Sequence, residues 1–240
     1  MVSTLVNFSR GNQIVATLDK TLYRDFLDRL EVVQLSQGAA VYEADSRIDY
    51  VYFPTTAVFS MLATMEDGST AEVGPVGREG LVGLRIFLGA DTSPDRVVVH
   101  LAGNALRLKT NLLKGELARD ETALRLKLLR YTQMLLVMTG RTGACSKLHS
   151  LEQQLARWLL TMNDYIGGEL HLTHELMALT LGVRRAGISV AASDFRTHKL
   201  IDYARGSIRI INKTALEELS CECYGVIKKE YEDLYSDLSK

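Results

Sequence analysis

The residues best suited to chemistry gather between positions 184 and 213, where positive charges dominate. This segment holds seven basic residues against two acidic ones, although the whole chain carries a formal net charge of −1. Clustered arginines and lysines attract phosphate groups, and such contacts supply most of the sequence-independent affinity of proteins for nucleic acids. The segment therefore predicts a local anion-binding surface. Its basic members are Arg184, Arg185, Arg196, Lys199, Arg205, Arg209 and Lys213.

The histidines do not form a recognisable catalytic or metal-binding pattern. His100 is the only histidine within residues 1–110, so that part of the chain offers no partner for a metal triad. His171 and His174 flank a predicted helix start and have no third ligand at suitable spacing. We therefore expect no metal, no cofactor and no enzymatic activity.

The three cysteines, Cys145, Cys221 and Cys223, are an odd number in a chain of 240 residues. This count argues against a disulfide framework and for a reducing compartment. Cys221 and Cys223 fall near a predicted C-terminal helix, where alternate positions would point to different faces. We interpret both as structural or exposed thiols, with a redox or metal role as the alternative. For Cys145, near the end of a predicted dimer helix, an intersubunit disulfide under oxidation is a hypothesis.

Residues 173–200 read as two helices around a tight turn, which would position the basic residues. Thr173 can cap the first helix, and Gly182 can adopt the left-handed conformation of the turn. Ala178 and Ile188 flank that glycine at spacings that let the second helix approach the first. The pattern is typical of a helix-turn-helix, although it also fits a plain helical hairpin.

The second predicted helix has an apolar inner face and a slim, partly basic outer face. A slim face suits the major groove of DNA, which is about 12 Å wide, and arginine can pair bidentately with guanine. We therefore interpret Arg184 and Arg185 as candidates for base or phosphate contact. Gly187 lowers the stability of this helix and would allow close backbone approach to phosphate. The inner residues are Ile188, Ala191, Ala192 and Phe195, and the outer ones are Arg185, Ser189 and Ser193.

A predicted hairpin follows directly, with the strand-like runs LIDYA and SIRII on either side of Arg205 and Gly206. Such a wing would bring Arg205 and Arg209 to the phosphate backbone. The complete set of expected nucleic-acid contacts is Arg184, Arg185, Ser189, Ser193, Thr173, Arg205 and Arg209.

A heptad-like stripe lies before this region, in a predicted helix that opens at Asn111. The stripe consists of the six interface residues named below and Glu121, which follow one another at alternating spacings of four and three residues. This spacing favours pairing with a second copy of the chain. The alternative is that the helix packs on its own β domain. Gly140 and Gly143 predict a hinge before the next helix. The expected dimer interface is Leu117, Leu124, Leu128, Tyr131, Leu135 and Met138.

Short β-branched and aromatic runs between residues 31 and 109 predict a small antiparallel roll, with a hairpin turn at Asp67 and Gly68. The glycines of GPVGREGLVG predict positive φ angles or close backbone approach. The expected fold is α+β. It has a β-roll, sensor-like domain over residues 1–110, a dimerisation helix and hinge over 111–145, and a winged helix-turn-helix domain over 146–240.

No stretch approaches the ~20 apolar residues that a membrane span needs. The N-terminal residues also lack a basic flank followed by an apolar core, which a secretion signal would have. We therefore expect a cytoplasmic protein without a membrane partner.

The order of these parts, with the segments FPTTAVFSMLATMEDGSTAEVGPVGREGLVGL, HSLEQQLARWLL, LGVRR and SCECY, resembles the CRP/FNR family of bacterial transcription regulators. The resemblance covers nearly the whole chain. It implies a cyclic-nucleotide-binding-like β-roll over residues 31–110, a long dimer helix over 111–140 and a winged helix-turn-helix over 173–212.

Some positions depart from the pattern of that family. Gly83 is followed by Leu84, where members that bind cyclic AMP have a glutamate for the ribose hydroxyl. Arg96 looks like the phosphate-binding arginine, but Val97 replaces the hydroxyl residue that follows it. These four residues are the candidate effector pocket. Unpaired ligand groups there would cost about 1 to 3 kcal/mol each, so cyclic AMP is not the expected effector.

Two further departures concern the iron-sulfur sensors and the operator. The oxygen sensors of the family need an N-terminal cysteine cluster, whereas the first cysteine here is Cys145. Ala186 and Val190 replace the glutamate and second arginine of the best-known recognition helices, so their operator sequence does not carry over.

The sequence therefore predicts a transcription regulator that binds double-stranded DNA as a homodimer on a pseudo-palindromic operator. RNA polymerase is a further expected partner. Two alternatives stay open for control: a small-molecule effector other than cyclic AMP modulates the protein, or the protein has no effector. The alternative is a ligand-binding or protein-interaction module that no longer binds DNA.

Overall fold

The computed structural model describes residues 11–119, 123–204 and 206–238, and these form two compact units. The first unit comprises the chain up to Ala63, Gly74–Leu136 and the residues from Tyr231 onward. The second comprises Thr64–Val73 and Val137–Glu230. None of the helices within the described ranges is long and apolar enough to cross a membrane.

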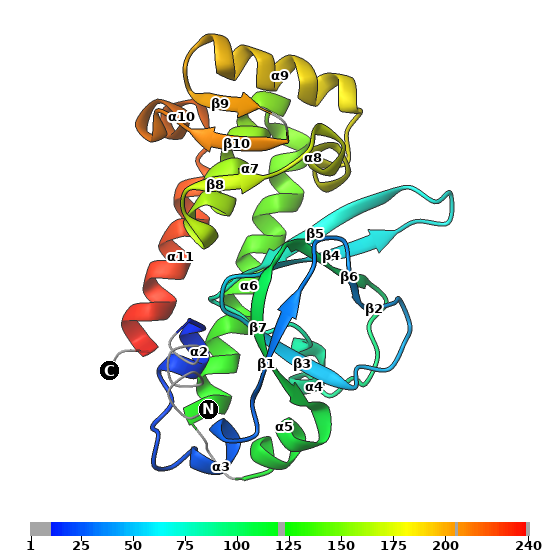
Figure 1. Ribbon diagram of the computed structural model, residues 1–240, viewed down its shortest axis with the longest axis vertical. Coiled ribbons are helices and arrows are strands. Elements are labelled where there is room, and N and C mark those ends of the chain that lie inside the picture. Colours follow the sequence, from blue (N-terminus) through cyan, green and yellow to red (C-terminus); the bar gives the residue numbers. More distant parts are fainter. Residues whose placement is uncertain (1–10, 120–122, 205, 239–240) are drawn as a thin grey trace. The chain divides into compact units, whose positions relative to one another are not determined.

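Residues 31–109 form two antiparallel sheets, as their β-branched and aromatic runs predict (Figure 1). Most of these residues belong to the first unit, whereas Thr64–Val73, the turn of one hairpin and the strand residues next to it, belong to the second. One sheet has the strand order β1 (Glu31–Leu35), β7 (Gly103–Lys109) and β3 (Tyr50–Pro54). The other has the order β2 (Ala40–Tyr42), β6 (Arg96–Leu101), β4 (Val58–Thr64) and β5 (Thr70–Val76). The predicted turn between β4 and β5 is confirmed, since Gly68 has φ +82° and Asp67 Oδ1 accepts a hydrogen bond from the Ser69 N–H.

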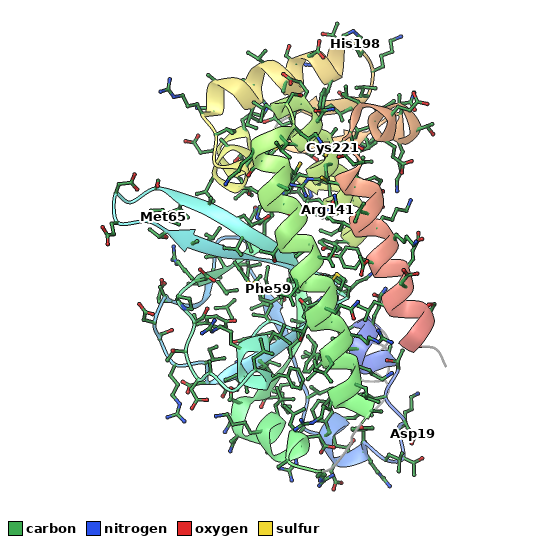
Figure 2. All side chains as sticks on the ribbon, turned by 180° about the vertical axis from the view of Figure 1, so that it is seen from behind. Asp19, Phe59, Met65, Arg141, His198 and Cys221 are labelled. Atoms are coloured by element: carbon green, nitrogen blue, oxygen red, sulfur yellow. The ribbon has the colours of Figure 1, made fainter. Side chains whose placement is uncertain are left out.

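Short helices complete the first unit around a core of aromatic and aliphatic side chains. They are α2 (Gln13–Ala16), α3 (Arg24–Leu27) and α4 (Leu84–Phe87). Phe53 and Phe59 are fully buried in the core, and Phe59 is labelled among the side chains in Figure 2. The predicted close approach in the glycine-rich segment is confirmed at Gly80, because a Cβ there would lie 2.3 Å from the hydroxyl oxygen of Tyr131.

The stretch expected to form one helix from Asn111 is two helices, α5 (Thr110–Leu117) and α6 (Ala123–Leu148). Glu121 lies outside the described residues. Gly140 and Gly143 do not break α6, which continues to Leu148, so the predicted hinge at these glycines is wrong as a helix end. Helix α6 begins in the first unit and ends in the second.

The predicted dimer interface needs correction, because its side chains are used within the single chain. Leu117, Leu124, Leu128, Tyr131 and Met138 are buried, and Leu135 is partly buried against the core of the first unit. The alternative that this stripe packs on its own β domain is therefore confirmed for its first-unit members. A different row of α6 is exposed, with Leu126 at 63%, Leu129 at 50% and Leu136 at 70%.

The second unit contains the predicted winged helix-turn-helix, visible in yellow and orange in Figure 1. Its strands have the order β8, β10, β9, in which β8 was not predicted. The elements are α7 (Leu151–Ile166), β8 (Glu169–His171), α8 (His174–Leu181), α9 (Arg185–Thr197), β9 (Ile201–Ala204), β10 (Ser207–Ile210), α10 (Lys213–Leu219) and α11 (Cys223–Leu238), whose last residues belong to the first unit.

Candidate nucleic-acid interface

The joint between α8 and α9 has the geometry that the sequence predicts. Thr173 Oγ1 accepts a hydrogen bond from the Leu176 N–H at 3.1 Å and so caps α8. Gly182 ends that helix with φ +64°, a conformation that glycine adopts without steric cost. Ala178 and Ile188 are buried on either side of the turn. These contacts fix the direction in which α9 leaves the turn.

Helix α9 buries one face and presents the other to solvent. Ile188, Ala191, Ala192 and Phe195 are all buried, as the apolar period predicts. On the outer side, Arg184, Arg185, Ala186, Val190 and Ser193 are exposed, and Ser189 is half-buried. The exposed face therefore combines two cations with small side chains, the composition expected of a helix that enters a major groove.

Ser189 makes contacts inside the protein as well as facing outward. Its hydroxyl lies 2.9 Å from Nδ1 of His174 and 3.1 Å from the backbone oxygen of Arg185. The His174 ring stacks on Tyr203 with a centroid separation of 4.6 Å. Burial lowers the pKa of His174, and the positive charge of Arg185 lowers it further. This group thus links α8, α9 and β9.

The arginines at the interface are exposed and only loosely paired. Arg185 Nη1 lies 3.6 Å from Glu175 Oε2, and Arg209 Nη2 lies 3.9 Å from Glu169 Oε2. Exposed ion pairs of this kind contribute about 0 to 1 kcal/mol, so a phosphate can replace the carboxylate at little cost. Arg205 lies outside the described residues.

The hairpin predicted from LIDYA and SIRII is present as β9 and β10, with Gly206 at φ +78°. Strand β8 extends it on the other side, where Ser207 Oγ donates a hydrogen bond to Glu169 Oε1 at 2.5 Å. The wing is therefore a three-stranded sheet. Strand β8 has only three residues, so its alternation of apolar and polar side chains is too short to be recognised from the sequence.

Gly187 has an internal role that the sequence did not indicate. A Cβ at this position would lie 2.8 Å from Cδ2 of Leu151, so the absence of a side chain lets α9 approach α7. The expected purpose, close backbone approach to phosphate, is not needed to explain this glycine.

The candidate effector pocket does not present the side chains that a phosphorylated ligand would need. Leu84 and Val97 are buried in the core of the first unit. Arg96 Nε already lies 2.8 Å from Glu43 Oε2, so an anion would have to displace a carboxylate. Gly83 has φ +93° and precedes α4, where a Cβ would lie 2.9 Å from Cγ1 of Val51. The left-handed φ angle alone favours glycine here, and the Val51 side chain adds a close contact.

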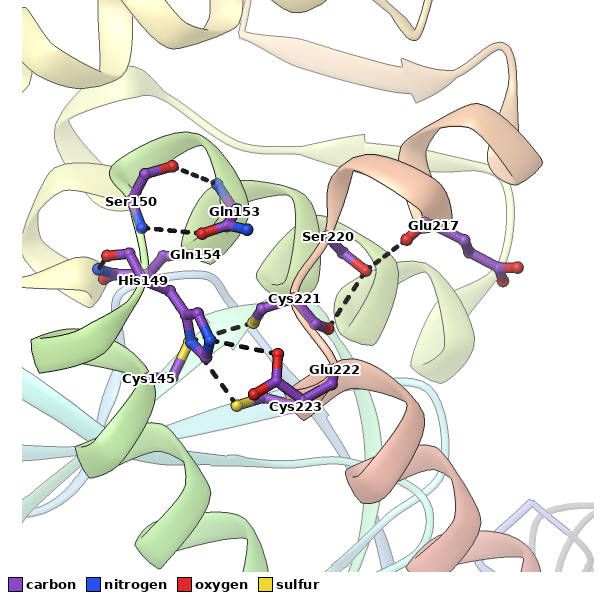
Figure 3. Close-up of polar contacts among 10 residues, drawn as sticks. All are labelled: Cys145, His149, Ser150, Gln153, Gln154, Glu217, Ser220, Cys221, Glu222 and Cys223. Carbon is purple, nitrogen blue, oxygen red and sulfur yellow. Dashed lines mark hydrogen bonds and ion pairs between the residues drawn. The ribbon is translucent and has the colours of Figure 1, made fainter.

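The cysteines are arranged differently from the expectation. Cys145, Cys221 and Cys223 are all buried, and Cys145 Sγ lies 3.4 Å from Cys221 Sγ of the same chain. The buried Cys145 thiol therefore faces a thiol of its own chain, which argues against an intersubunit disulfide. Cys221 and Cys223 do not point to different faces, because Cys221 precedes α11, so the helical alternation does not apply. Both reach one cluster, which also contains His149 (Figure 3).

Burial raises the pKa of the Cys145 thiol to about 12, although the positive charge of Arg157 acts in the opposite direction. The pKa of Cys223 is also raised by burial and by the neighbouring Cys221. Burial thus favours the protonated thiol at Cys145 and Cys223 when no cation is bound. Sequence reasoning missed His149 as their neighbour, since it lies four positions from Cys145 but 74 positions from Cys223.

Comparison with known proteins identifies the second unit. Residues 153–219 match the Crp-like helix-turn-helix domain. No curated protein matches the chain by sequence at a significant level.

Solved structures with the same fold cover most of the chain. FixK2 from Bradyrhizobium japonicum has a TM-score of 0.69 at 17% identity, covering 80% of this chain and 98% of that one. A putative CRP/FNR-family regulator from Eubacterium rectale has a TM-score of 0.61 at 18% identity, covering 85% and 95%. CLP from Xanthomonas campestris, described as a c-di-GMP responsive global regulator, has a TM-score of 0.64 at 13% identity, covering 81% and 100%. The predicted fold class is confirmed, and the predicted family resemblance is confirmed by sequence over residues 153–219.

Proposed function

We propose that this chain, which has the fold of the CRP/FNR regulators and carries their Crp-like helix-turn-helix domain, regulates transcription by binding double-stranded DNA as a homodimer. The observation that carries the proposal is the outer face of α9, where Arg184 and Arg185 flank small exposed side chains opposite a fully buried face.

The residues of this face would divide the work of recognition. Arg184 and Arg185 lie at the N-terminal end of α9, the part of a recognition helix that contacts base edges in helix-turn-helix proteins. Val190 is 70% exposed and offers an apolar contact for a thymine methyl group. Ser193 is short enough to leave room for the groove edge.

The wing and the start of α8 would hold the phosphate backbone. Arg209 on β10 and Arg205 beside it in sequence are the cationic candidates. The hydroxyl of Thr173 already caps α8, so its direct contact with DNA would be secondary to that role. Ser189 in turn has to share its hydroxyl with His174. We therefore assign the larger binding energies to the arginines.

Pairing of two copies would use the exposed row of α6. Leu126, Leu129 and Leu136 are separated by three and seven residues, which places them on one face of the helix, and Gln133 lies between the last two. A homodimer through this row would match the two-fold symmetry of a pseudo-palindromic operator.

The proposal includes control by a small-molecule effector other than cyclic AMP. The β-roll of the first unit, within residues 1–110, would be the sensing part, residues 111–145 the dimerisation part and residues 146–240 the DNA-binding part. RNA polymerase would be a further partner.

The test is selection of bound DNA from a random pool by the purified full chain, followed by a salt titration of the selected sequence. We expect a two-fold symmetric motif with half-sites about one helical turn apart, and affinity that falls steeply as salt rises. The absence of any enriched sequence, with and without metabolites of a cell extract, would favour a module that contacts protein instead.

A further inference from the structure

All three cysteines of the chain meet at one place in the second unit, together with one histidine. Cys145 lies in the last turn of α6, and His149 directly follows that helix. Cys221 lies in the turn between α10 and α11, and Cys223 is the first residue of α11. Figure 3 shows the four side chains converging from these two segments. Two segments about 75 residues apart thus supply two donors each.

The donor atoms have the spacing of a single coordinated ion. The three sulfurs and one ring nitrogen all lie within 4.8 Å of one another, and the Cys223 Sγ to His149 Nδ1 distance is 3.9 Å. A Zn–S bond of about 2.3 Å puts neighbouring sulfurs of a tetrahedral site about 3.8 Å apart. The distances between donor atoms, from 3.4 Å between Cys145 Sγ and Cys221 Sγ up to the limit of 4.8 Å, include that value. A four-iron cluster would hold its cysteine sulfurs farther apart, because the iron-sulfide cage lies between them.

The orientation of His149 is that of a metal ligand. Its Nδ1 faces the sulfurs, while Nε2 lies 3.2 Å from Oε2 of Glu222. Histidines that bind metals usually donate the N–H of the other ring nitrogen to a carboxylate, which fixes the tautomer and raises the basicity of the ligand nitrogen. Glu222 stands between Cys221 and Cys223 in sequence, so one short segment provides two ligands and the supporting carboxylate.

The surroundings hold this arrangement in place. Ser150 caps α7 in a reciprocal capping box with Gln153, which fixes the backbone next to His149. Tyr224 donates a hydrogen bond from its hydroxyl to Asp164 Oδ2 at 2.7 Å, which fixes the start of α11 on α7. A disulfide between Cys145 and Cys221 would leave Cys223, His149 and Glu222 without a purpose in the cluster.

We propose that Cys145, His149, Cys221 and Cys223 bind one Zn²⁺ ion as a closed, tetrahedral structural site of the DNA-binding unit. On binding, the three thiols release their protons to solvent and His149 binds as the neutral imidazole. The site then carries a net charge of −1, which the buried Arg157 near Cys145 offsets. Four protein ligands leave no open position for substrate, so the role is to join the end of α6 to the start of α11.

The experiment measures bound metal on the full chain, purified under reducing conditions from cells supplied with zinc. We expect one equivalent of zinc per chain, as measured by inductively coupled plasma mass spectrometry. Replacement by Co²⁺ should give the visible absorption of a tetrahedral thiolate site. Cys221→Ser and His149→Gln should lose the metal, whereas the control His198→Gln, at an exposed histidine of the same unit, should retain it.

Folding is monitored in the same samples, and Glu222→Gln provides a variant that keeps all four ligands. Because the carboxylate supports His149, we expect this variant to bind zinc with a roughly 10- to 100-fold weaker apparent affinity than the wild type. Competition with a chelator measures this affinity. A folded wild-type chain without stoichiometric metal would overturn the proposal, as would full metal retention by Cys221→Ser. A Cys145–Cys221 disulfide in the reduced preparation would do the same. These outcomes do not depend on DNA binding.

Discussion

At the scale of single residues, the proposed function predicts that some arginines of the second unit recognise bases and that others contact the phosphate backbone. We expect Arg184→Ala and Arg185→Ala to weaken binding and to change the preferred bases if either pairs with guanine, at a cost of about 1 to 3 kcal/mol for each lost pair. Arg205→Ala and Arg209→Ala should weaken all sequences alike and reduce the salt slope by about one. Fluorescence anisotropy with the selected and scrambled duplexes measures both effects.

The control for these variants is Arg24→Ala, which removes an exposed arginine of the first unit that pairs weakly with Asp28. Its affinity should equal that of the wild type. Unchanged affinity in all four interface variants would mean that α9 and the wing do not meet DNA.

His100 makes the stability of the first unit depend on pH. Burial lowers its pKa from 6.5 to about 4. Below pH 6.5 the imidazole of His100 binds a proton in the unfolded chain but stays neutral in the folded chain. The free energy of unfolding therefore falls as the pH drops toward 4. The loss amounts to about 3 kcal/mol at the lower limit. We expect His100→Gln to lack this component in urea denaturation between pH 7 and 4, and an identical pH slope in both proteins would contradict the assignment.

Two glycines of the first unit test packing against helix propensity. Gly80→Ala places a methyl group against the buried ring of Tyr131, and overpacking of this kind typically costs about 1 to 3 kcal/mol. Gly115→Ala lies in α5 with open space around it, so higher helix propensity should stabilise the protein by up to about 1 kcal/mol. Thermal unfolding of the two variants should shift in opposite directions, and equal shifts would count against the close approach at Gly80.

At the scale of elements, the exposed row of α6 decides whether the chain pairs with itself. Leu129→Glu puts a charge in the middle of that row, so we expect a dimer to dissociate to monomers in analytical ultracentrifugation. Leu22→Glu is the matched control, since Leu22 is equally apolar and 76% exposed but lies outside α6. A dimer that survives Leu129→Glu would have to use another surface.

The same helix shows where sequence reasoning stops. Leucines occur both in the predicted stripe, as Leu124 and Leu128, and in the exposed row, as Leu126 and Leu129, so α6 has apolar residues on two faces. Periodicity identifies each row but does not say which one meets the β domain. That choice depends on where Gly80 leaves room for Tyr131, a tertiary contact with a residue 51 positions away.

Local signals, by contrast, are sufficient where one short segment determines the structure. Thr173 and Gly182 bound α8 as predicted, and Asp67 with Gly68 forms the expected turn. The cysteine cluster lies at the other extreme, because its ligands come from two distant segments and one of them, His149, is a histidine with no evident motif. Only the folded chain brings them together.

At the scale of the whole molecule, the proposed homodimer would let two copies act together on DNA, which matters because the chain is nearly neutral with a formal net charge of −1. A single unit offers few cationic contacts, and non-specific binding by such units is weak at physiological salt. A symmetric pair of recognition helices about 34 Å apart would instead read two half-sites on one side of the duplex.

This arrangement predicts a sharp dependence on half-site spacing. Insertion of about five base pairs, half a helical turn, at the centre of the selected operator would place the second half-site on the opposite side of the duplex. We expect the affinity in an electrophoretic mobility assay to fall to that of an isolated half-site. The wild-type chain should therefore bind the lengthened operator more weakly than the original one. The Leu129→Glu variant, which as a monomer contacts one half-site at a time, should bind both operators equally. If the wild-type chain bound both operators with the same affinity, each copy would be recognising DNA on its own and the dimeric regulator would be wrong.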